Sequence, residues 1–71
     1  MIRVFITDDH AVLRSGLRLM INSEPDMEVI GEADCGASAL EQIEGLKPDV
    51  ILMDITLPDM NGVEVIRALK Q

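Results

Sequence analysis

Three short apolar runs, each followed by a segment of helical periodicity, constrain the fold of this 71-residue chain more than any other feature. The runs cover Ile2 to Ile6, Met27 to Ala33 and Val50 to Met53, and β-branched residues are frequent in them. Strict alternation of strand and helix indicates parallel strands joined by crossover helices. We therefore predict an α/β fold with a three-stranded parallel sheet in the order 2-1-3 and flanking helices.

The helical segments carry start and stop signals of their own. We predict helices over Ala11 to Asn22, from Gly36 to Gly45, and over Val63 to Lys70. Pro25 ends the first segment, because a residue before proline disfavours helical geometry. The stretch "TLPDMNG" reads as a loop, in which we expect Gly62 to supply backbone freedom. In the first helix, the apolar face consists of Leu13, Leu17, Met20 and Ile21.

Length and composition exclude several classes of protein. The chain is long enough for one domain, which we place at residues 1–71. Its net charge is −7, from 13 acidic and 6 basic residues, which makes these residues a poor nucleic-acid binder. A single cysteine, Cys35, forbids an internal disulfide and fits a reducing, cytoplasmic compartment. No apolar run approaches the roughly 20 residues of a membrane span.

Carboxylates follow two of the three predicted strands. Asp8 and Asp9 come directly after the first strand, and Asp54 comes directly after the third. In an open parallel sheet, functional groups gather at the carboxyl ends of neighbouring strands. Carboxylates that converge repel one another unless a cation compensates them. Oxygen ligands of this kind suit a hard divalent cation such as Mg²⁺.

Simpler interpretations compete with a metal site. Asp8 or Asp9 alone could cap the first helix, although Asp54 at a second strand end weakens that interpretation. His10 reads as a satisfied side chain at a helix start rather than a ligand or a base. Asp59 lies in a turn where aspartate is routine, so we interpret it as structural.

The motifs "DDH", "ILMD" and "LPDMNG" together resemble those of the receiver domain of two-component response regulators, over all 71 residues. The stretches "DDHAVLRSGLRLMI" and "VIGEADCGASALEQI" are most similar to the subfamily with a LuxR/FixJ-type helix-turn-helix output domain. The resemblance implies a partial flavodoxin-like fold. It also implies that Asp54 is the phospho-acceptor and that Asp9 and Asp54 coordinate Mg²⁺ directly. Asp8 would assist through water, and the backbone carbonyl of Thr56 would be a further ligand.

The resemblance also implies partners. A sensor histidine kinase would donate the phosphoryl group, and the domain would assist its own phosphorylation without being a turnover enzyme. The parent protein would be a cytoplasmic transcriptional regulator that contacts DNA only through an output domain, with no membrane partner. Receivers have five βα units, whereas this sequence contains three, so we expect a receiver truncated after the third unit. An unpaired third-strand edge, residues 50 to 53, would then favour self-association.

Two other functions remain open. The chain could be a non-phosphorylated module used for dimerisation. It could also be a phosphatase of the haloacid dehalogenase type, which likewise uses an aspartate after an apolar strand. That family requires a second aspartate two residues later, where this chain has Thr56, and it leaves the Asp8–Asp9 pair unexplained.

Overall fold

Three strands and three helices alternate along the chain in the computed structural model, which describes residues 1–70. They form one parallel sheet in the order β2-β1-β3 with flanking helices, so the predicted fold class and strand order are confirmed. The elements are β1 (Ile2–Thr7), α1 (Ala11–Asn22), β2 (Met27–Ala33), α2 (Gly36–Leu46), β3 (Val50–Met53) and α3 (Gly62–Leu69).

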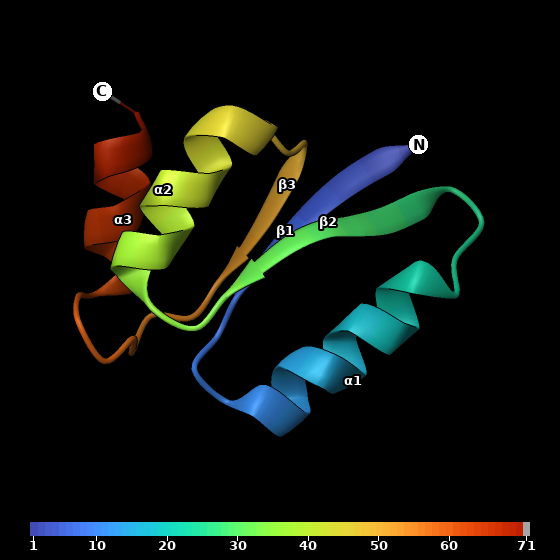
Figure 1. The fold of residues 1–71 in the computed structure, drawn as a ribbon, viewed down its shortest axis with the longest axis horizontal. Helices are drawn as coiled ribbons and strands as arrows, with labels where there is room; N and C mark the ends of the chain where they lie inside the picture. The colour runs from blue at the N-terminus through green and yellow to red at the C-terminus, as the bar shows by residue number, and fades with distance from the viewer. Residues whose placement is uncertain (71) are drawn as a thin grey trace.

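The helices lie on both faces of the sheet. Helix α1 covers one face, while α2 and α3 lie side by side on the other (Figure 1). Strand β1 is central, and its last four residues are buried, as expected for a strand covered on both faces. Strand β3 pairs with β1 along one edge, and its Val50 and Leu52 are 41% and 37% exposed. The last four residues of β1 are therefore buried, whereas β3 contains no buried residue.

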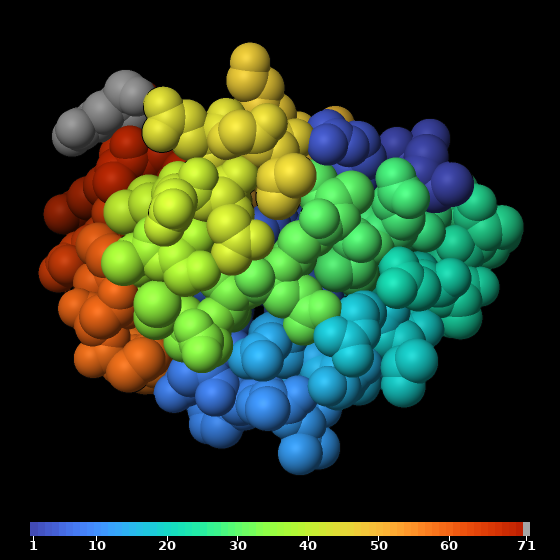
Figure 2. Space-filling model, viewed as in Figure 1, coloured from blue at the N-terminus to red at the C-terminus, as the bar shows by residue number. Residues whose placement is uncertain are grey.

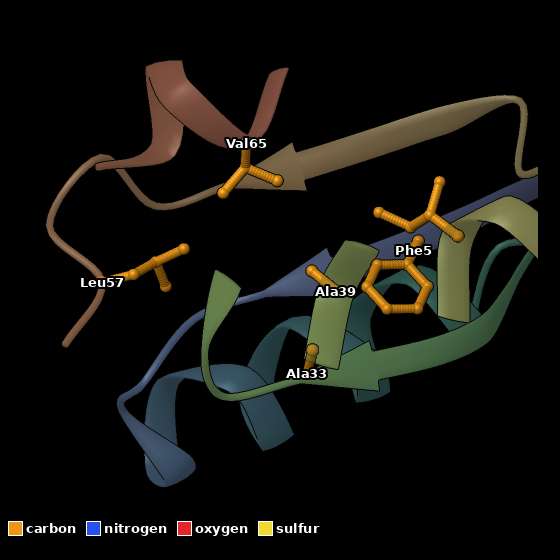
Figure 3. Packing of buried hydrophobic residues seen from close by; sticks show 6 residues of the cluster. Phe5, Ala33, Ala39, Leu57 and Val65 are labelled. Atoms are coloured by element: carbon orange, nitrogen blue, oxygen red, sulfur yellow. The ribbon is translucent and has the colours of Figure 1, made fainter. Parts of the chain in front are cut away.

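The main hydrophobic core lies between the sheet and the α2–α3 layer. Phe5 belongs to a cluster of buried side chains from β1, β2, α2, α3 and the β3–α3 loop, with Ala39 beside its ring and Leu57 at the other end (Figure 3). Phe5 lies opposite Gly31 in the β1–β2 register, and a Cβ on Gly31 would come within 2.8 Å of the ring. The core thus joins the elements on which the functional site is built. Its buried members are Phe5, Ala33, Ala39, Ile43, Leu57 and Val65.

Helix α1 is less deeply packed than its sequence predicts. None of its residues is buried, and Leu13 and Met20 from the expected apolar face are 51% and 69% exposed. Polar contacts hold the helix as well, because Arg14 and Arg18 both form ion pairs with Glu32 of β2. The contacts between α1 and the sheet therefore include ion pairs as well as the partly buried Leu17 and Ile21.

Helix α2 ends beyond Gly45, the residue that we expected to terminate it. The helix continues to Leu46, and Lys47 adopts the left-handed conformation, with φ 50° and ψ 61°. The guanidinium of Arg3, on β1, donates hydrogen bonds to the carbonyls of Leu46 (2.7 Å) and Lys47 (3.0 Å). The helix therefore ends one residue beyond the predicted position, and a tertiary contact satisfies carbonyls at its end.

Candidate functional site

The site lies at the carboxyl ends of β1 and β3. Asp8 follows β1 and donates its backbone N–H to the carbonyl of Ala33 at 3.0 Å. Asp54 follows β3 and donates its backbone N–H to the carbonyl of Thr7, also at 3.0 Å. Sheet pairing therefore continues one residue beyond each strand, and it fixes the backbones from which the carboxylates project.

The structure brings the three predicted aspartates together. One ligand atom each from Asp8, Asp9, His10 and Asp54 lies within 4.8 Å of the others. The exposed fractions of the three carboxylate side chains are 12% for Asp8, 33% for Asp9 and 19% for Asp54. Carboxylates that are this close and this sheltered repel one another unless positive charge compensates them. We call these four residues the acid cluster.

The imidazole of His10 is a shared partner of the carboxylates in the acid cluster. Its Nδ1 lies 2.9 Å from Asp8 Oδ1, 3.1 Å from Asp9 Oδ1 and 3.9 Å from Asp54 Oδ2. The hydrogen bond with Asp8 and the negative charge of Asp9 raise the pKa of the imidazole. His10 is a satisfied side chain at a helix start, and its partners are the site carboxylates.

The helix-cap interpretation of Asp8 and Asp9 was wrong. The N-cap residue of α1 is His10, and no side chain forms a capping hydrogen bond at this helix end. Asp8 instead accepts the backbone N–H of His10 at 2.8 Å and faces the acid cluster.

Asp54 receives two hydrogen bonds from one neighbouring residue. Its Oδ1 accepts the Thr56 backbone N–H at 3.0 Å and the Thr56 hydroxyl at 3.2 Å. The hydrogen bond from the Thr56 backbone N–H contributes most to lowering the pKa of Asp54, because it stabilises the ionised carboxylate. These two hydrogen bonds use the backbone N–H and the hydroxyl of Thr56. Neither involves its backbone carbonyl, whose role as a Mg²⁺ ligand stays a prediction.

Gly62 is required for space and not for backbone freedom. No glycine among residues 1–70 has a positive φ, so our expectation for Gly62 was wrong. Its amide donates to the Ile55 carbonyl at 2.9 Å. A Cβ on Gly62 would lie only 2.3 Å from the carbonyl oxygen of Asp54. Only a residue without a side chain lets α3 begin so close to the site.

Asp59 connects the β3–α3 loop to another helix. Its carboxylate accepts the backbone N–H groups of Gly36 (2.7 Å) and Ala37 (2.9 Å) at the start of α2. These hydrogen bonds lower the pKa of Asp59. In Figure 2 the orange loop region adjoins the yellow-green residues of α2. Sequence reasoning assigned Asp59 to its own turn and missed this contact, which joins residues 22 and 23 positions apart.

A parallel α/β sheet with an aspartate pair after one strand and a third aspartate after its neighbour defines a receiver-type signalling domain. The family model described as response regulator receiver domain matches residues 4–71 of this sequence, and the chain belongs to that family. The resemblance inferred from the motifs is therefore confirmed, and it displaces the haloacid dehalogenase alternative.

Similar proteins support the same assignment. The chain is 42% identical over 69 residues to the DNA-binding transcriptional activator DevR/DosR of Mycobacterium tuberculosis, covering 97% of this chain and 32% of the relative. The response regulator domain of Thermotoga maritima CheB superposes with a TM-score of 0.94 at 46% identity, covering 97% of this chain and 52% of that one. A LuxR-family response regulator from Aurantimonas gives a TM-score of 0.92 at 35% identity, with 97% and 49% coverage.

The chain thus spans about a third of the curated relative and about half of the solved chains. Receiver domains accept phosphoryl groups from histidine kinases, bind Mg²⁺ at an acidic cluster and are not turnover enzymes. Within residues 1–70, no helix combines the length and apolar character needed to cross a membrane.

Proposed function

We propose that residues 1–71 form the N-terminal portion of a receiver domain that accepts a phosphoryl group on Asp54. The observation that carries this proposal is the acid cluster, in which Asp54 lies against Asp8, Asp9 and His10. A helix cap or a turn aspartate would not require carboxylates from two strand ends to meet. A phosphorylation site requires them, because the reacting groups must be held together.

The donor set fits Mg²⁺, which prefers carboxylate oxygens and retained water. The Nδ1 of His10 already lies within 3.1 Å of two carboxylates, where a positively charged partner is favourable. We assign Asp9 and Asp54 as direct ligands, Asp8 as a ligand through water, and the carbonyl of Thr56 as a further ligand. When bound, Mg²⁺ supplies positive charge that neutralises oxygens of the transferring phosphoryl group.

Asp54 acts as the nucleophile toward a phosphohistidine of a sensor kinase. A carboxylate oxygen forms a new bond to phosphorus while the bond between phosphorus and the histidine nitrogen breaks. The electron pair of the broken bond remains on the departing imidazole, and the product is an aspartyl phosphate. The hydrogen bonds from Thr56 lower the pKa of Asp54, so no proton has to be removed before attack.

The experiment exposes the chain to Mg²⁺ and a small acyl-phosphate donor and measures the intact mass. We expect the mass to increase by one phosphoryl group in the wild type and in Asp59→Asn, but not in Asp54→Asn. Beryllofluoride with Mg²⁺, followed by NMR, should shift the Asp54 amide resonance. If the wild type is not phosphorylated and its Asp54 amide resonance does not shift, the proposal fails and the non-phosphorylated interaction module remains as the alternative.

We further propose that the parent protein is a cytoplasmic, DNA-binding transcriptional regulator. Support comes from the similarity to DevR/DosR, whose name describes a DNA-binding activator. The net charge of −7 makes these residues unsuited to DNA, so another part of the parent would contact it. Purified parent protein should bind its promoter more tightly after phosphorylation, whereas the 71-residue chain should not bind DNA.

A second candidate function is self-association of the 71-residue chain through β3. Strand β3 pairs only with β1 among the described residues, and Val50 and Leu52 on it are partly exposed. An exposed apolar edge favours pairing with another chain. Sedimentation should show a dimer that Leu52→Lys dissociates and Leu19→Lys, on exposed α1, does not. A monomer at high concentration would contradict this proposal.

A further inference from the structure

We infer that Arg14 is a positioning residue for the acid cluster. Its guanidinium fixes the backbone carbonyl of Asp8 and thereby the direction in which Asp9 projects. This inference rests on the proposed Mg²⁺-dependent phosphorylation of Asp54, and it assigns a role in that reaction to a residue outside the cluster.

The contacts of Arg14 join three elements of the fold. Its Nη1 donates to the carbonyl oxygen of Asp8 at 2.6 Å, and its Nε donates to Glu32 Oε1 at 3.1 Å. The side chains of Arg14 and Glu32 are each 21% exposed. Hydrogen bonds to a charged donor are strong, and partial shelter from water strengthens them further. Arg14 therefore links α1 to β2 and to the segment that carries the aspartate pair.

The backbone of Asp8 is held from two sides. Its N–H is bonded to the Ala33 carbonyl of β2, and its carbonyl is bonded to Arg14 of α1. Because a peptide unit is planar, the carbonyl of Asp8 and the amide of Asp9 turn together. Fixing the carbonyl therefore restricts the rotation that would swing Asp9 away from Asp8 and Asp54. Asp9 is the most exposed of the three carboxylates, at 33%, so it has the least packing to hold it.

Arg18 provides a matched comparison on the same helix. It lies one turn after Arg14, and its Nη1 donates to the other oxygen of Glu32 at 2.5 Å. Among the described contacts, only Arg14 of the two also reaches the backbone of Asp8. Loss of either arginine removes an ion pair with Glu32. Only the loss of Arg14 also removes the hydrogen bond to the Asp8 carbonyl.

The test compares Arg14→Met, Arg14→Lys and Arg18→Met with the wild-type chain. Calorimetric titration gives the Mg²⁺ Kd, urea denaturation gives stability, and NMR without metal gives the Asp9 amide resonance. We expect Arg14→Met to raise the Mg²⁺ Kd about tenfold, as loss of a group that orients metal ligands commonly does. Arg14→Lys should not restore binding, because one ammonium lacks the fork that holds both acceptors. Arg18→Met should lose some stability, because its ion pair with Glu32 is removed, and it should keep the wild-type Kd.

The possible outcomes separate this inference from the proposed function. Wild-type Mg²⁺ affinity in Arg14→Met would overturn the positioning role, and so would full recovery in Arg14→Lys. An equal loss of affinity in the two methionine variants would assign the effect to the packing of α1 and would also overturn it. If the wild type binds no Mg²⁺, the proposed function fails. The Asp9 resonance then decides: a shift in Arg14→Met but not in Arg18→Met supports positioning, and equal resonances refute it.

Discussion

Replacing Gly62 by alanine would have two opposing effects on stability, a steric clash at the site and a gain in helix propensity. Gly62 is the first residue of α3, and alanine favours a helix over glycine by roughly 1 kcal/mol. The new Cβ would lie 2.3 Å from the Asp54 carbonyl oxygen, whereas real Cβ contacts do not fall below 3.0 Å, so a shift of at least 0.7 Å is required. The contacted atom belongs to the backbone and cannot rotate away.

The expected loss of stability follows from this clash. Overpacking of a rigid site costs about 1–3 kcal/mol, which exceeds the gain in helix propensity. A domain of this size has a free energy of unfolding of only about 4–10 kcal/mol. The loss is therefore measurable. Because the displaced atom belongs to Asp54, we also expect weaker Mg²⁺ and beryllofluoride binding.

Urea denaturation followed by far-ultraviolet circular dichroism measures the effect, since the chain has no Trp or Tyr. The matched controls are Gly16→Ala and Gly45→Ala, where an added Cβ would meet nothing within 4 Å. Both controls lie inside helices and should gain about 0.5–1 kcal/mol. A Gly62→Ala variant as stable as Gly45→Ala would refute the close-approach argument.

Three further predictions concern residues whose environment is unusual. Lys47→Gly should gain about 1 kcal/mol in urea denaturation because Lys47 has a positive φ, and equal stability in Lys47→Ala and Lys47→Gly would contradict this. Thr7→Val should gain about 1 kcal/mol, because the buried Thr7 hydroxyl has no partner among the described residues; a less stable variant would count against it. The lowered pKa of Asp59 means that ionised Asp59 stabilises the fold above its unfolded pKa, and this contribution is lost as pH falls through the folded pKa. Thermal melts between about pH 6 and 3 should therefore show a smaller acid-induced fall in Tm for Asp59→Asn than for wild type, and parallel curves would argue against this role.

The sequence by itself determined the layout of the fold and the place of the site. Apolar runs and helical spacing are local patterns, and they located α1 (Ala11–Asn22) and β2 (Met27–Ala33) at their observed bounds. The convergence of Asp8, Asp9 and Asp54 followed from parallel-strand geometry, because residues that end neighbouring strands must meet at one edge.

Only the tertiary structure decided how the site is supported. Arg3 caps α2, Arg14 holds the Asp8 carbonyl, and Asp59 bonds the start of α2. Gly62 leaves room for the backbone of Asp54, and Lys47 takes the positive φ that we had no reason to assign to it. The physical reason is shared by all of them. Periodicity along the chain encodes strands and helices, whereas these features depend on distances between elements, which are set only when the helices pack on the two faces of the sheet.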